Sequence, residues 1–132
     1  MTKILIIEDD SKLSDEIATS LRVAGFEVQI AKDGIIGVQY ALQTVPDLIV
    51  CNLSIPKLDG YGVFLELRAD PVTSTIPVIF VASGDFDHLN RPRISFESED
   101  FLVKPFNKEK LLKKINRYQV KKKPARLHFL YS

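Results

Sequence analysis

Short apolar runs and amphipathic segments alternate along the whole chain. The apolar runs are rich in β-branched residues, as expected for strands that are buried on both faces. We predict strands at residues 4–7, 27–31, 48–51, 76–82 and 101–103, and helices at 11–24, from 33 onward, at 60–69 and from 107 to about 118. Strands that alternate with helices are typical of βαβ units. The pattern therefore predicts an α/β domain with one parallel sheet and helices on both of its faces.

Polar residues mark the starts of three of these helices. Ser11, Asp33 and Asn107 are good N-caps, because their side chains accept hydrogen bonds from backbone N–H groups in the first helical turn. Gly25 is placed to end the first helix. These signals predict where three helices start and where the first helix ends.

The helical pattern fails between residues 83 and 97. Gly84, Asn90 and Pro92 interrupt it, and a proline inside a helix costs ~3 kcal/mol. We therefore predict a fourth helix that is short or disrupted.

Size and composition indicate one soluble domain. The chain has 132 residues, of which 45% are hydrophobic and 27% charged. Its apolar runs are too short for a transmembrane helix or a signal sequence, so we expect a cytoplasmic protein without membrane contact. The single cysteine, Cys51, lies inside an apolar run and is expected to be a buried hydrophobic residue.

Charge is distributed unevenly. Residues 1–106 carry 9 Lys and Arg against 16 Asp and Glu, whereas residues 107–132 carry 9 against one. The acidic body argues against direct nucleic-acid binding by this domain. Residues 119–132 are predicted to form a basic C-terminal tail or linker. An arm that docks on this domain or on a partner is an equal alternative for the same residues, because the segment also holds large apolar side chains.

Polar side chains follow the first and third predicted strands. Glu8, Asp9 and Asp10 come directly after the first strand, and Asn52 ends the third. In a parallel α/β sheet the functional site lies beyond the carboxyl ends of the central strands. Carboxylates gathered there repel one another unless a cation is supplied, and Mg²⁺ prefers such oxygen ligands.

A third signal joins these two near the end of the chain, where Lys104-Pro105 follows the fifth strand. Together, the acidic cluster, the segment from Asn52 to Gly60 and the Lys-Pro pair resemble the receiver domain of two-component response regulators. The resemblance covers roughly residues 2–118, and it places the receiver domain at residues 1–118. It implies a flavodoxin-like (βα)5 fold with a doubly wound parallel sheet in the strand order 2-1-3-4-5. It also implies a signalling module that is not an enzyme.

The resemblance assigns metal-binding roles to one group of residues. Glu8 and Asp9 match the acidic pair of the family, with Asp9 the direct ligand of Mg²⁺. Asn52 stands at the position of the phosphoacceptor aspartate, and the carbonyl of Ser54 matches the backbone ligand of the metal.

A second group matches the positions that respond to phosphorylation. Lys104 corresponds to the lysine that contacts the phosphoryl group, and the bond to Pro105 resembles one that the family keeps cis. Phe101 holds the aromatic switch position. Ala82 stands where the family has a threonine or serine hydroxyl. The partners implied are a histidine kinase, another signalling protein or an output domain, and a homodimer through the face of the fourth helix, fifth strand and last helix.

Two of these positions depart from the family. An amide cannot form the acyl phosphate that a carboxylate forms, so phosphorylation at Asn52 is expected to fail. The lost negative charge is expected to weaken Mg²⁺ binding. Ala82 offers no hydroxyl. We therefore expect a degenerate receiver that acts through protein–protein contacts.

Other interpretations remain open. A conventional receiver with an engineered Asp-to-Asn change, as the N-terminal part of a DNA-binding regulator, would share the pattern, but an engineered change would not explain Ala82. A flavin-binding electron carrier has the same strand order, yet it needs a phosphate-binding loop after the first strand. The acids at residues 8–10 would repel a phosphate.

Overall fold

The computed structural model describes residues 2–82 and 101–131, and within them five parallel strands form one sheet in the order β2-β1-β3-β4-β5. The predicted strand order is confirmed. The strands are β1 (Lys3–Ile7), β2 (Glu27–Ala31), β3 (Leu48–Asn52), β4 (Val78–Ala82) and β5 (Phe101–Val103). Because β1 and β3 are neighbours, their carboxyl ends lie side by side.

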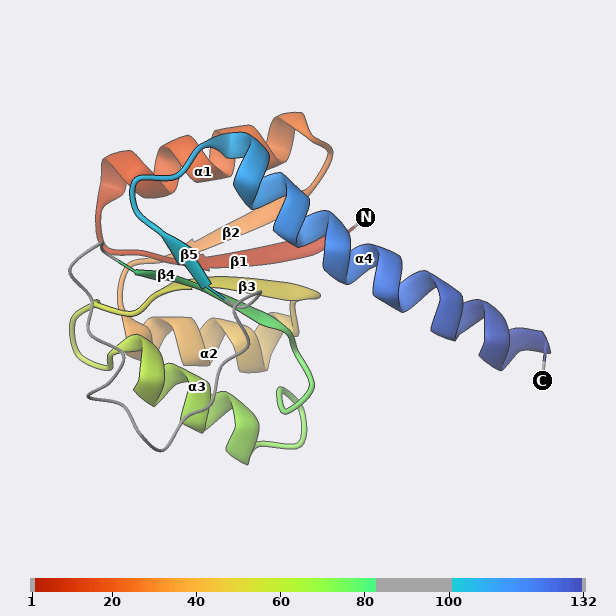
Figure 1. The fold of residues 1–132 in the computed structure, drawn as a ribbon. Coiled ribbons are helices and arrows are strands. Elements are labelled where there is room, and N and C mark those ends of the chain that lie inside the picture. Colours follow the sequence, from red (N-terminus) through yellow and green to blue (C-terminus); the bar gives the residue numbers. More distant parts are fainter. Residues whose placement is uncertain (1, 83–100, 132) are drawn as a thin grey trace.

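Helices cover both faces of this sheet (Figure 1). The described helices are α1 (Ser11–Val23), α2 (Gly34–Thr44), α3 (Gly60–Ala69) and α4 (Lys108–Tyr131). One core cluster joins the sheet to α1 and α4, and the other joins it to α2 and α3. β1, β3 and β4 bury side chains in both clusters, which is why their sequences are continuous apolar runs.

Helix α1 begins at Ser11, as the predicted range does, but its N-cap differs from the prediction. Asp10, and not Ser11, is the N-cap, because its backbone is extended and its carboxylate accepts a hydrogen bond from Leu13 N at 3.1 Å. Ser11 already has helical geometry as the first residue of the helix. Gly25 follows the helix with a φ of 96°, a conformation that suits glycine. The Asp33 cap of α2 and the Gly60–Ala69 bounds of α3 are confirmed.

Strand β4 begins two residues later than predicted, at Val78 rather than Ile76. Pro77 has no N–H group to donate to the neighbouring strand, so the ladder starts after it. Its carbonyl still accepts a hydrogen bond from Ile49 N at 3.0 Å. The apolar run is therefore longer than the strand it forms.

Helix α4 runs well past its predicted end at about Tyr118. Its backbone stays helical as far as Tyr131, and in Figure 1 the second half of the helix extends away from the sheet. Lysine, arginine, leucine and alanine, which have favourable helix propensity, make up most of this part, and Pro124 does not end it. The boundary placed at residue 118 therefore falls inside a helix, and a separate tail at 119–132 remains a prediction.

The predicted disruption of a helix between residues 83 and 97 lies outside the described residues. Within residues 2–82 and 101–131, no helix has both the length and the apolar character needed to cross a membrane.

Candidate functional site

The candidate site lies at the carboxyl edge of the sheet, where β1 and β3 end together. The two strands pair in parallel, with Ile7 opposite Cys51. Glu8 follows Ile7 and Asn52 follows Cys51, so Glu8 and Asn52 lie side by side at the ends of the two strands. Both side chains are buried, Glu8 with only 2% of its surface exposed.

Four hydrogen bonds surround the Glu8 carboxylate. The Asn52 amide nitrogen donates to Oε1 at 3.1 Å and to Oε2 at 2.9 Å. The Lys104 ammonium donates to Oε1 at 3.2 Å, and the backbone N–H of Asp10 donates to Oε2 at 3.2 Å. A buried carboxylate needs such partners, because an unpaired charge is costly away from water. We call Glu8, Asn52 and Lys104 the closed triad.

The orientation of the Asn52 amide follows from its two sets of partners. Its oxygen accepts a hydrogen bond from Ser54 N at 3.1 Å, while its nitrogen faces the Glu8 carboxylate, which can only accept. Reversing the amide would place oxygen against oxygen. Asn52 therefore presents donors to the site, whereas an aspartate would present only acceptors.

Lys104 reaches the site from the end of β5. Its backbone N–H donates to the carbonyl of Ala82 at 2.7 Å, which fixes the end of β5 beside β4. The peptide bond from Lys104 to Pro105 is cis. The Lys104 side chain is 29% exposed, so its ion pair with Glu8 lies at the edge of the buried region. This ion pair balances the carboxylate charge with an ammonium of the chain itself.

The other predicted switch residues lie in or next to the sheet. Ala82 is buried at the carboxyl end of β4 and offers only a methyl group. The half-buried Phe101 ring packs 5.8 Å from the Phe80 ring, measured between centroids, at the edge of the α2 and α3 core. The structure therefore brings Glu8, Asn52 and Lys104 into direct contact, but it places Phe101 in core packing.

The donor set does not fit a divalent cation as it is arranged. Both oxygens of Glu8 already accept hydrogen bonds, and Asn52 turns its oxygen to Ser54 N. Asp9 is exposed. Among the residues that the structure describes, no group of three His, Cys, Asp or Glu side chains could hold a metal ion. Within the closed triad, Lys104 balances the charge of the Glu8 carboxylate and Asn52 donates hydrogen bonds to it, a role that a bound cation would otherwise fill.

The loop after β3 is held against the start of α2. Lys57 has a φ of 69°, and its ammonium lies 3.7 Å from the Asp33 carboxylate. At the end of this loop Gly60 begins α3 close to the chain of β3. A Cβ atom on Gly60 would lie 2.7 Å from the Leu53 Cα, so a larger residue would displace the loop beside Asn52.

Cys51 lies next to Asn52 but points into the core. Burial raises the pKa of its thiol, and the negative charges of Glu8 and Asp59 raise it further. A protonated, fully buried thiol is unreactive. The structure therefore agrees with the expectation of a buried hydrophobic residue.

Sequence reasoning missed two features of this site. The backbone of Asp10 donates to Glu8 while its side chain caps α1, so one residue fixes both the carboxylate and the helix. The donor role of the Asn52 amide was also missed. An amide placed beside an acidic cluster was the available signal, because only its nitrogen can face a carboxylate.

Comparisons with known proteins identify the family of this chain. The chain matches the response regulator receiver domain family over residues 4–116. It is 40% identical over 117 residues to the DNA-binding dual master transcriptional regulator RpaA of Synechocystis sp., a match covering 87% of this chain and 48% of RpaA. The chain therefore spans about half the length of this relative.

Solved structures give the same result. A response regulator receiver domain protein from Clostridium thermocellum has a TM-score of 0.80 at 28% identity, covering 95% of this chain and 99% of that one. The receiver domain of the sensor histidine kinase PA1611 from Pseudomonas aeruginosa, which has a magnesium ion coordinated in its active site cleft, has a TM-score of 0.79 at 27% identity, covering 89% and 96%. This chain belongs to the response regulator receiver domain family.

Proposed function

We propose that this receiver domain signals through protein–protein contacts and is not phosphorylated at position 52. The single observation that carries the proposal is the closed triad, in which the Asn52 nitrogen and the Lys104 ammonium both bond to Glu8. A carboxylate nucleophile would attack phosphorus through an oxygen lone pair and form an acyl phosphate. The Asn52 oxygen carries no full charge and is bonded to Ser54 N, so this step has no nucleophile.

The surroundings of position 52 support the same proposal. Lys104 is engaged with Glu8, and Ala82 provides no hydroxyl group to follow a phosphoryl group. The switch from an unphosphorylated to a phosphorylated state therefore lacks two of its chemical groups, the carboxylate nucleophile and the hydroxyl, and its lysine is paired with Glu8. A domain without this switch would present the same binding surface at all times. A histidine kinase, an output domain or another signalling protein would recognise that surface.

The test is phosphorylation by a small acyl phosphate in the presence of Mg²⁺, followed by intact-protein mass measurement. The wild-type chain is expected to gain no phosphoryl group. The Asn52→Asp variant is the matched comparison, because only one side-chain group changes. Stable, Mg²⁺-dependent labelling of the wild type would contradict the proposal.

A second candidate is the receiver half of a DNA-binding regulator. It is favoured by the similarity to RpaA, which is named as a DNA-binding regulator and is about twice as long as the matched region. The natural open reading frame tests it. A DNA-binding domain encoded downstream in the same frame would support this candidate, and a stop codon after residue 132 would contradict it.

We further propose a homodimer through the face of the fourth helix, the fifth strand and the last helix, of which β5 and the last helix, α4, lie within the described residues. β5 is an edge strand, and Val103 at its end is 55% exposed. Val103→Asp is expected to lower the dimer fraction in sedimentation experiments. Val72→Asp is the matched control, because Val72 is 52% exposed and lies in the turn between α3 and β4, outside the proposed face. Equal behaviour of the two variants would contradict the proposed interface.

A further inference from the structure

Helix α2 presents an exposed face that carries no charge. Its 11 residues, Gly34–Thr44, include no Asp, Glu, Lys or Arg, whereas α1 holds four such residues and α3 two. The side of a helix that meets solvent ordinarily gathers charged and polar residues. The exposed face of α2 therefore differs in chemistry from those of α1 and α3.

Three exposed residues form one row on this face. Ile35, Gln39 and Leu42 follow one another at intervals of four and three residues, so they lie on the same side of the helix. Ile35 is 47% exposed and Leu42 is 39% exposed. Val45, the C-cap of α2 with a φ of 45°, adds a further exposed apolar side chain just after the helix. We call Ile35, Gln39 and Leu42 the α2 row.

The packing of α2 on the sheet keeps this row exposed. Gly37 and Ala41 are buried on the side of the helix that faces the sheet. A Cβ atom on Gly37 would lie 2.6 Å from Ile7 Cδ1, so the helix backbone is close to β1. This close approach leaves no room for α2 to turn and bury Ile35 or Leu42 against β1. Within the described part of the chain, the α2 row therefore stays open to a second molecule.

The chemistry of the α2 row suits contact with a copy of itself. A two-fold contact places the same patch on both sides, so a charged patch would meet charges of its own sign. The α2 row has no charge to repel. Gln39, at its centre, has a side-chain amide that both donates and accepts, so the Gln39 amides of two copies can bond to each other. A partner of opposite charge would instead be matched by a charged face.

We propose that the α2 row binds the same row of a second copy of this chain. The two helices would pack antiparallel about a two-fold axis near Gln39, with Ile35 of each copy against Leu42 of the other. The face of one 11-residue helix is small beside the about 800 Å² per partner of stable complexes, so the pair is expected to be weak. Because α2 packs on the opposite face of the sheet from α1 and α4, this contact is separate from the dimer proposed at β5 and α4 (Figure 1).

The test is sedimentation equilibrium of the full chain carrying Val103→Asp, which removes the contact proposed at β5. Concentration-dependent association is expected to remain and to persist at high salt, because the α2 row has no charges for salt to screen. Ile35→Lys and Leu42→Glu, each added alone, are expected to weaken it roughly tenfold or more, because each buries an unpaired charge. Val23→Glu is the matched control. Val23 is 84% exposed on α1, on the other face of the sheet, so this variant is expected to associate as before.

Mixing the two charged variants tests the antiparallel arrangement. In that arrangement the new lysine of one copy faces the new glutamate of the other, so the mixture is expected to form heterodimers that are tighter than the pairs of either variant alone. Circular dichroism checks that each variant remains folded. Absence of association in the Val103→Asp chain, its loss at high salt, equal weakening by Val23→Glu, or no recovery in the mixture would overturn the proposal. Asn52→Asp is expected to leave the association unchanged, so failure here is distinguishable from failure of the phosphorylation proposal.

Discussion

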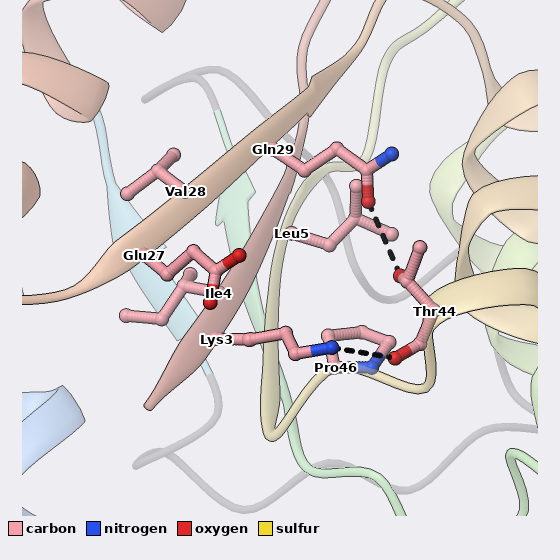
Figure 2. A pocket seen from close by; sticks show the side chains of 8 residues that line it. All are labelled: Lys3, Ile4, Leu5, Glu27, Val28, Gln29, Thr44 and Pro46. Atoms are coloured by element: carbon pink, nitrogen blue, oxygen red, sulfur yellow. Dashed lines mark hydrogen bonds between the residues drawn. The ribbon is translucent and has the colours of Figure 1, made fainter. Parts of the chain in front are cut away.

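The charged side chains at the two ends of β1 differ in burial and in hydrogen bonding. At the carboxyl end, Glu8 is buried, and Asn52, Lys104 and the backbone of Asp10 satisfy it. At the amino end, Lys3 is exposed, and its ammonium makes one long hydrogen bond of 3.4 Å to the carbonyl of Thr44 (Figure 2). One strand thus joins a buried charge that the chain itself satisfies to an exposed charge that faces water.

Sequence changes at the two ends of β1 are expected to differ in their effect on stability. A buried charge with one partner removed keeps its cost of desolvation, so changes at the carboxyl end are expected to destabilise the fold. Exposed charges are screened by water, so changes at the amino end are expected to leave stability nearly unchanged.

The largest effect is expected for Asn52→Asp without divalent cations. The variant replaces a donor by a carboxylate beside Glu8 and leaves Lys104 to balance both charges. We expect the free energy of unfolding to fall by about 3 kcal/mol, measured by urea denaturation. A variant as stable as the wild type in the absence of divalent cations would refute the donor role of Asn52.

Lys104→Ala is expected to lower the free energy of unfolding by about 2 kcal/mol, because Glu8 loses its charged partner. Lys57→Ala is the control. The Lys57 side chain is 65% exposed and lies 3.7 Å from Asp33, so its removal is expected to cost less than about 0.5 kcal/mol. Equal losses in the two variants would show that the Lys104–Glu8 pair is an ordinary surface ion pair.

The pH dependence of stability reports on Cys51. Folding raises the pKa of its thiol, so the native thiol stays protonated while the unfolded chain ionises above about pH 8.5. The stability that this burial provides is present below that pH and is lost as pH rises. Relative to Cys51→Ala, the wild type should lose about 2 kcal/mol by pH 10, as followed by denaturation at several pH values. Parallel pH profiles of the two proteins would contradict this.

Asp10→Ala is expected to cost about 1 kcal/mol, because α1 loses its N-cap. Ser11→Ala is the control and should change the free energy of unfolding by less than about 0.5 kcal/mol. Thermal unfolding of the two variants measures the difference. A larger loss in Ser11→Ala would restore the N-cap expected from the sequence.

The smallest effect is expected at the amino end, with the opposite sign. Val45→Gly relieves the left-handed strain and should raise the free energy of unfolding by about 0.5 kcal/mol, after the entropic cost of glycine. Val23→Gly is the control in the last turn of α1, where the backbone is helical, and it should not stabilise. Destabilisation by Val45→Gly would show that the Val45 side chain contributes more than its strain costs.

Local signals in the sequence were enough for most of the fold. The run from Leu48 to Asn52 predicts a strand buried on both faces, and Asp33 predicts the start of α2. Strand order followed from the family resemblance. The N-cap of α1 was missed because Asp10 and Ser11 are both good caps, and only the backbone geometry decides between them.

The candidate site was predicted only in part. The meeting of Glu8, Asn52 and Lys104 followed from the ends of three strands, but the direction of the Asn52 amide depends on where Glu8 and Ser54 N lie in space. Contacts between distant segments set that direction, and no periodicity in the sequence encodes them.

The most direct measurement of the central claim is the effect of Mg²⁺ on stability. If the closed triad already balances the Glu8 charge, saturating Mg²⁺ leaves the free energy of unfolding of the wild type unchanged and raises that of Asn52→Asp. A wild type that Mg²⁺ stabilises as much as it stabilises Asn52→Asp would contradict the account.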